Sequence, residues 1–228
     1  MHRSITLTAL LVVALGPSLV QGQEPSYKGK SVSEWAEQLG ASLATSREEA
    51  VASLAKIGAP AVPALAKALG NEKFYARLCA AEALGKIGPG AKEAAPALIE
   101  LFGDEIEIRK EAISSLGKIG KAAVPTLVKA LGDKEKTVRE YAAASLGKAG
   151  PDAKDAVPAL VKTLSEDDES VVRFEAASAL GSIGPKAKEA IPALIKALAD
   201  DDFQVRYIAG MSLKKIDPEA AKKAGVKP

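Results

Sequence analysis

The stretch VRFEAASALGSIGPKAKEAIPALIKALAD, residues 172–200, contains the two signatures that decide the fold. In the first, Arg173 is followed eleven positions later by Gly184, which ends a Leu-Gly-Ser-Ile-Gly phrase. In the second, Pro192 lies in an Ile-Pro-Ala-Leu phrase. Both signatures recur along the chain, and self-similarity at a regular period indicates a repeat architecture.

The repeat is 30 to 34 residues long, measured from one arginine to the next. The arginine-to-glycine spacing occurs at Arg47–Gly58, Arg77–Gly88, Arg109–Gly120, Arg139–Gly150 and Arg173–Gly184, and again at Arg206 with Asp217 in place of the glycine. The proline phrases contain Pro63, Pro96, Pro125, Pro158 and Pro192.

Each signature predicts one helix. Between Arg139 and Gly150 the apolar residues follow helical spacing and form one face. The closing glycine suits a helix C-terminus that needs a positive φ, and a following proline such as Pro151 prevents the helix from continuing. A second helix is expected to begin near Pro158, because proline is tolerated in a first helical turn.

The predicted unit is therefore helix A, a short turn, helix B and another short turn. One such pair cannot bury its own apolar stripes, so neighbouring pairs must stack. We expect an all-α, right-handed solenoid of stacked antiparallel helix pairs, free of strands. The repeat domain spans residues 31–228, with an N-terminal half-repeat at 31–40, where Trp35 takes the place of Leu65, and repeats from about residue 46 to residue 217.

These phrases resemble the HEAT-repeat family, in particular its short-repeat branch named after phycobilin lyases. The resemblance covers Val32 to Asp217. It implies a curved α-solenoid in which helix B lines the concave face. It does not imply one function, because a fold of this kind serves binding proteins and enzymes alike.

The N-terminus has the pattern of a secretory signal peptide over residues 1–22. Arg3 gives a short basic region, Ile5 to Leu15 is apolar, and small residues precede a cleavage site after Gly22. Residues 23–30 are then a polar linker. The chain is expected to be exported to the periplasm or the exterior of a bacterium; retention of the segment as a membrane anchor is the alternative.

The composition excludes several classes of chemistry. His2 is the only histidine, so the mature chain has none for acid–base catalysis or metal binding. Cys79 is the only cysteine, which excludes an internal disulfide and a multi-cysteine metal site. We therefore expect no catalytic residues, no cofactor and no metal. With 31 basic and 29 acidic residues, the chain also lacks the positive charge typical of nucleic-acid binding.

One row of residues is the candidate partner-binding site. A lysine occupies the same slot of helix B in four repeats, while Glu100 and Glu37 fill it elsewhere. An aligned basic row could steer an acidic protein or peptide, although solvated lysines that keep the surface soluble are the alternative. The candidate residues are Lys67, Lys129, Lys162 and Lys196.

The repeat arginines are interpreted as structural, because each follows an acidic or polar turn and the family resemblance implies ladder contacts between repeats. They are Arg47, Arg77, Arg109, Arg139, Arg173 and Arg206. Cys79 occupies a slot that holds Glu111 and Tyr141 in other repeats, which predicts a partly exposed thiol.

The leading functional hypothesis is an exported, non-enzymatic and monomeric protein-binding scaffold that uses helix B. The alternative is an enzyme or enzyme subunit resembling the phycobilin lyases, which the signal peptide disfavours. DNA binding by a relative of HEAT-like glycosylases is disfavoured by the near-zero net charge.

Overall fold

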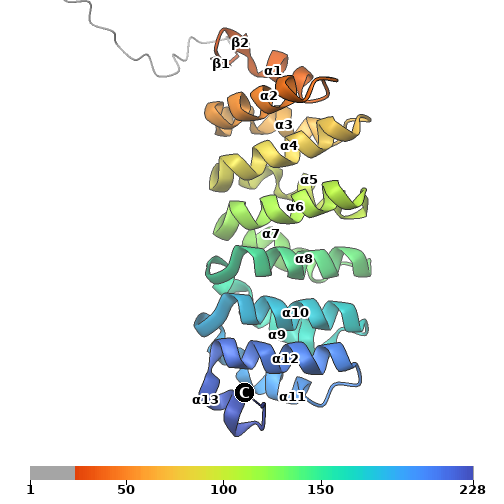
Figure 1. The fold of residues 1–228 in the computed structure, drawn as a ribbon, viewed down its shortest axis with the longest axis vertical. Helices are drawn as coiled ribbons and strands as arrows, with labels where there is room; N and C mark the ends of the chain where they lie inside the picture. The colour runs from red at the N-terminus through yellow and green to blue at the C-terminus, as the bar shows by residue number, and fades with distance from the viewer. Residues whose placement is uncertain (1–23, 228) are drawn as a thin grey trace, which may run out of the picture.

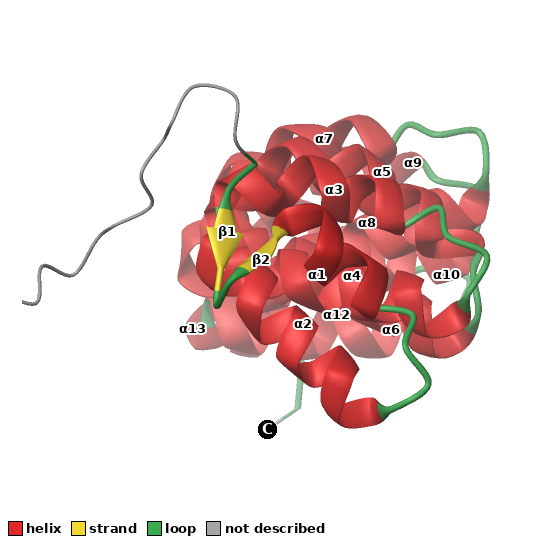
Figure 2. Ribbon diagram, turned by 90° about the horizontal axis from the view of Figure 1, so that it is seen from above, coloured by secondary structure: helices red, strands yellow, loops and turns green. Residues whose placement is uncertain are grey.

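A computed structural model of the chain describes residues 24–227, and their helices form two layers stacked in one column (Figure 1). The A layer of this part consists of long helices with 14 residues each: α2 (Ala44–Ile57), α4 (Phe74–Ile87), α6 (Ile106–Ile119), α8 (Lys136–Ala149), α10 (Ser170–Ile183) and α12 (Phe203–Ile216). The B layer consists of α1 (Val32–Gln38), α3 (Val62–Ala68), α5 (Ala95–Glu100), α7 (Val124–Ala130), α9 (Val157–Glu166) and α11 (Ile191–Ala197). A final helix, α13 (Pro218–Lys223), follows α12. Seen along the column, the two layers lie side by side (Figure 2).

The helices form where the hydrophobic period requires them. The leucine seven positions after each repeat arginine is fully buried, because it lies on the face that the helical spacing directs inward. These residues are Leu54, Leu84, Leu116, Leu146, Leu180 and Leu213. The predicted all-α solenoid of stacked helix pairs is therefore confirmed.

The glycines that close helix A adopt positive φ, as predicted. Gly88, for example, has φ 68° and ψ −135°, a region that only glycine occupies without strain. The expected short turn after helix A is longer in the structure, since a 3₁₀ segment follows, and in four of these five segments a proline occupies one of the first positions. These segments are η1 (Ala59–Ala61), η2 (Gly88–Ala94), η4 (Gly120–Ala123), η5 (Gly150–Ala156) and η6 (Gly184–Ala190). A further one, η3 (Leu101–Gly103), extends α5.

Asp217 explains why the last repeat can dispense with its glycine. Its backbone is extended, with φ −154° and ψ 99°. Its carboxylate accepts hydrogen bonds from the N–H groups of Glu219 and Ala220, so it caps the N-terminus of α13.

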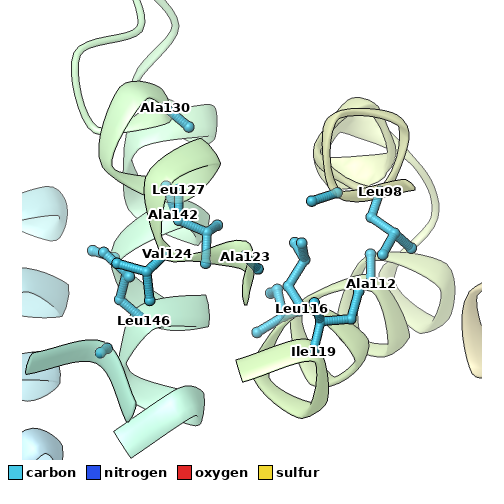
Figure 3. Close-up of a cluster of buried hydrophobic side chains, with 14 of the residues drawn as sticks. Leu98, Ala112, Leu116, Ile119, Ala123, Val124, Leu127, Ala130, Ala142 and Leu146 are labelled. Atoms are coloured by element: carbon cyan, nitrogen blue, oxygen red, sulfur yellow. The ribbon is translucent and has the colours of Figure 1, made fainter. Parts of the chain in front are cut away.

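The core runs without interruption between the two layers (Figure 3). Val124 and Leu127 of α7 lie beside Ala142 and Leu146 of α8, and all four are at most 4% exposed. Small residues such as Ala112 let neighbouring helices approach closely. The core is mainly aliphatic, with Trp35 and Phe102 as its fully buried aromatic side chains, in a chain of which only 4% is aromatic.

The N-terminal segment corrects the expectation of a polar linker over residues 23–30 and of a strandless chain. β1 (Ser26–Tyr27) and β2 (Lys30–Ser31) form a small antiparallel hairpin. Lys28 and Gly29 both adopt positive φ, as a tight hairpin turn requires. Trp35, 1% exposed, donates from Nε1 to the carbonyl of Tyr27 at 2.9 Å and fixes the hairpin on α1.

The predicted signal peptide over residues 1–22 lies outside the described residues. Between residues 24 and 227, no helix combines the length and the hydrophobicity needed to cross a bilayer.

Candidate partner-binding surfaces

The helix B lysines lie on one exposed surface. All four side chains project into solvent, from the last turn of α3, α7 and α11 and from the middle of the longer α9: Lys67, Lys129, Lys162 and Lys196. Glu100 on α5 and Glu37 on α1 are also exposed, so both interruptions of the row lie on the same surface.

An aliphatic row, which the sequence reasoning missed, runs beside the lysines. The residue that precedes each slot residue is half-buried at Ile99, Val128 and Val161. At Ile195 it is 41% exposed. The signal was present in the sequence, because a branched aliphatic residue precedes the slot in four consecutive repeats. We name the two rows together the helix B strip.

Two hollows open on this strip between neighbouring helices. The first, of about 280 Å³, lies between α7 and α9 and is lined by Val128, Ala159 and Lys162 among others. The second, of about 490 Å³, lies between α9 and α11 and contains Lys196. Acidic turn residues also line both hollows, and Lys162 pairs with Glu166 at 4.0 Å. The strip therefore presents lysines beside carboxylates and is not uniformly basic.

Three repeat arginines join their own repeat to the next one. Each guanidinium donates two hydrogen bonds to an aspartate 27 or 28 residues further along the chain and one or more to carbonyls of its own preceding turn. The pairs are Arg77–Asp104, Arg139–Asp167 and Arg173–Asp200. Such bidentate pairs are the strong form of an arginine–carboxylate contact.

In these pairs, each charged group favours the ionised form of its partner. Burial opposes ionisation of Asp167, but hydrogen bonds from Arg139 and from the N–H of Glu169 hold its pKa below the ordinary value. The pKa of Asp200 is lowered in the same way: burial raises it, but hydrogen bonds from Arg173 and from the N–H of Asp202 together hold it below the ordinary value. The hydrogen bond to Asp200 in turn raises the pKa of Arg173.

The other three repeat arginines have different partners. Arg47 lies 4.0 Å from the centre of the Tyr75 ring, a cation–π contact with the next repeat. Arg109 donates to the hydroxyl of Tyr141 at 2.9 Å. Arg206 contacts the carbonyls of its own turn. A tyrosine thus takes the place of the aspartate in two repeats.

Cys79 is 7% exposed, which corrects the expectation of a partly exposed thiol. Burial, assisted by the charge of Glu82, raises the pKa of the thiol, against the opposing charge of Arg47. The polar members of this slot misled the prediction, because here α4 packs its small thiol into the interface between repeats. The cysteine is a packing residue in a neutral form, without the lowered pKa of a reactive thiol.

A third hollow, which no sequence argument had suggested, lies on the A layer. It has a volume of about 670 Å³ and spans α6, α8 and α10. Lys110, Tyr141, Lys148 and Glu175 supply its charged and aromatic side chains.

No cluster of three or more metal-ligating side chains exists within the part of the chain that the structure describes. The lysine row and the arginine ladder meet at the hollows, since Lys196 and Arg173 line the hollow between α9 and α11, and Lys162 and Asp167 line the one between α7 and α9.

The comparisons with known proteins agree on the fold. HEAT repeats match over residues 32–106, 103–181 and 157–224. None of the curated proteins matches the chain. A solved chain from work on microtubule plus-end tracking by XMAP215, CLIP-170 and EB1 is similar, with 22% identity, a TM-score of 0.52, and coverage of 86% of this chain and 91% of that one.

Two further solved structures are similar to the chain with lower TM-scores. One is the complex of CpcE and CpcF of phycocyanin lyase from a Nostoc species, with 20% identity, a TM-score of 0.41, and coverage of 79% and 96% of the two chains. The other is a computationally designed armadillo repeat protein for modular peptide recognition, with 22% identity, a TM-score of 0.42, and coverage of 85% and 99%. With its repeats matched from residue 32 to residue 224, the chain belongs to the HEAT-repeat family.

Proposed function

We propose that this HEAT-repeat chain is a non-enzymatic scaffold that acts outside the cytoplasm and binds a polypeptide partner along the helix B strip. The observation that carries the proposal is the alignment of exposed lysines with aliphatic side chains on α7, α9 and α11. A repeat array presents such a strip as one extended surface.

The strip suits a polypeptide better than a small anion. Val128 and Val161 offer partly exposed apolar area beside Lys129 and Lys162, so that a partner can bury side chains and pair charges at once. The hollows between the helices can accommodate side chains of the partner. The partner's acidic groups are expected to face Lys129, Lys162 and Lys196, with a smaller contribution from Lys67 because Glu100 interrupts the row.

Three substitutions test the strip. The chain with Lys129, Lys162 and Lys196 all changed to glutamate is used as bait in bacterial envelope extract, beside the unchanged chain. A matched control carries glutamate at three exposed lysines of the 3₁₀ segments, Lys92, Lys154 and Lys188, so both variants have the same net charge. We expect the unchanged chain and the control to retain a common partner that added salt releases, and the strip variant to lose it.

The proposal fails if the strip variant retains the same proteins with the same salt response, or if none of the three baits retains a protein. Both variants should unfold within a few degrees of the unchanged chain, because exposed substitutions usually change stability by no more than about 0.5 kcal/mol each.

Export is part of the same proposal. The tripartite pattern that ends at Gly22 supports cleavage there, which leaves Gln23 as the first residue. N-terminal sequencing of the chain recovered from the periplasm or the medium tests it. Recovery of intact Met1 in the membrane fraction would instead establish the anchor.

A further inference from the structure

A pair of slots on helix A joins an acid to a lysine in one repeat. In α6 the acid two positions after the repeat arginine is Glu111, and the lysine nine positions after it is Lys118. Their charged groups lie 3.7 Å apart. The lysine thus neutralises a half-buried carboxylate on the outer face of its own helix.

This neutralisation is missing in α10. Glu175 occupies the acid slot, but Ser182 occupies the lysine slot. Among residues 24–227, no lysine or arginine nitrogen lies within 4.0 Å of the Glu175 carboxylate. Burial, assisted by the charge of Glu140, raises the pKa of Glu175, while the more distant Lys148 acts in the opposite direction.

The Glu175 carboxylate, which forms no salt bridge within 4.0 Å among the described residues, lines the hollow of the A layer together with Lys148. Small residues such as Ala144 and Gly147 line it on α8, and Ser178 and Ser182 contribute hydroxyl groups from α10. Tyr141 also lines it. Its hydroxyl accepts from Arg109, whose guanidinium carbon lies 5.1 Å from the centre of the ring, and the ring packs edge-on against that of Phe102, so the tyrosine is fixed before any ligand arrives.

We propose that this hollow binds a lysine or arginine side chain of a partner polypeptide, with its cationic group held by the Glu175 carboxylate and the Tyr141 ring. The bound cation takes the place that Lys118 has beside Glu111, two repeats earlier in the chain. An aromatic face beside a carboxylate is a general site for ammonium and guanidinium groups. The chain itself places a guanidinium on a tyrosine in this manner, where Arg47 lies over Tyr75.

The two lysines of the hollow restrict what the ligand can be. Lys110 and Lys148 are exposed and belong to α6 and α8, whereas Glu175 belongs to α10. They repel a molecule that is cationic along its whole length, such as a polyamine, and tolerate a single cation on a backbone whose carbonyls they can contact. The site lies on the opposite layer from the helix B strip, so it does not depend on the function proposed above.

The test uses three small probes and the ¹⁵N-labelled protein. N-acetyl-arginine methylamide represents the polypeptide ligand, its uncharged citrulline analogue is the control, and spermidine represents a polyamine. We expect the arginine probe to produce saturable shifts at the amides of Gly147 and Ser178, with the citrulline probe at least about tenfold weaker, or ~1.4 kcal/mol.

Three variants test whether Glu175 is responsible for binding of the arginine probe. Glu175→Gln should weaken the arginine probe at least tenfold, because the carboxylate is lost. Ser182→Lys should do the same by restoring the internal cation. Glu111→Gln, which removes the paired carboxylate of the same slot, should leave the shifts unchanged, and the spectra themselves show that each variant is folded.

The proposal is overturned if the arginine probe gives no saturable shift. It is equally overturned if the citrulline probe binds as well, or if Glu175→Gln and Ser182→Lys bind like the unchanged chain. Tighter binding of spermidine than of the arginine probe would show that the site takes a polyamine and not a polypeptide side chain.

Discussion

The guanidinium of Arg173 donates two hydrogen bonds of 2.9 Å to the carboxylate of Asp200, which lies 27 residues further along the chain. The same side chain donates to the carbonyls of Asp167 and Asp168, so it joins two successive turns of the solenoid. Both side chains are nearly buried, at 12% and 11% exposed.

Arg173→Ala should lower the free energy of unfolding by about 2 to 4 kcal/mol, because removing one member of a nearly buried pair leaves the other charge uncompensated. Denaturant unfolding followed by circular dichroism measures the change. Arg206→Ala is the matched control. Arg206 contacts only the carbonyls of its own turn within the described residues, so its loss should cost less than about 1 kcal/mol. Equal costs would show that the contact between repeats is not what stabilises the ladder.

Gly181→Ala should destabilise the chain by about 1 to 3 kcal/mol, although alanine favours a helix over glycine by about 1 kcal/mol. A Cβ at this position would come within 2.8 Å of the Cβ of Ser212 on the next helix, whose hydroxyl is held by the carbonyl of Ala177. At Gly147 the same change meets Ala179 at 3.3 Å or more, so Gly147→Ala should be close to neutral. Thermal unfolding of the two variants compares them, and a larger loss for Gly147→Ala would contradict the packing argument.

Acid should weaken the fold through Asp167 and Asp200. Their pKa values in the folded state lie below the ordinary value of 3.8, so the stability that they contribute is present above pH 3.8 and is lost as the pH falls through the lowered pKa. The variant Asp167→Asn/Asp200→Asn should be less stable at pH 7 and should show a shallower loss of melting temperature from pH 4 to pH 2. An unchanged slope in that range would mean that other groups govern acid unfolding.

Glu175 should have the opposite pH dependence. Its pKa is raised in the folded state, so its contribution to stability is complete below the ordinary value of 4.5 and is lost as the pH rises through the raised pKa. Glu175→Gln, which is permanently neutral, should therefore raise the melting temperature at pH 7 and have little effect at pH 4. The result to look for is this difference between the two pH values; a decrease at pH 7 would show that the carboxylate is stabilised by a contact of its own.

The repeat pattern was sufficient to predict the helices, since the period of the buried leucines and the closing glycines act within a single repeat. Features that depend on two repeats were harder to predict. Whether an arginine meets an aspartate or a tyrosine, whether Cys79 is covered, and whether Glu175 finds a lysine all depend on side chains about 30 residues apart. The N-terminal hairpin was missed for a related reason, because Trp35 holds two strands too short to be recognised from hydrophobic alternation.

The lysine row was predicted in its position but not in its surroundings. Residue slots place Lys129, Lys162 and Lys196 on one surface. The aliphatic neighbours and the acidic linings of the hollows emerge only when helices from different repeats are set side by side, because each hollow takes residues from two of them.

The ladder pairs of this molecule join only consecutive turns, at intervals of 27 or 28 residues. No end of the array is therefore needed to complete the other, and the repeat that contains Asp167 and Arg173 carries both halves of the same joint. Removal of that repeat would bring Arg139 opposite Asp200, a guanidinium and a carboxylate that already match. During evolution, such a chain can become longer or shorter by whole repeats, while each remaining repeat presents the same arrangement of side chains on the binding surface.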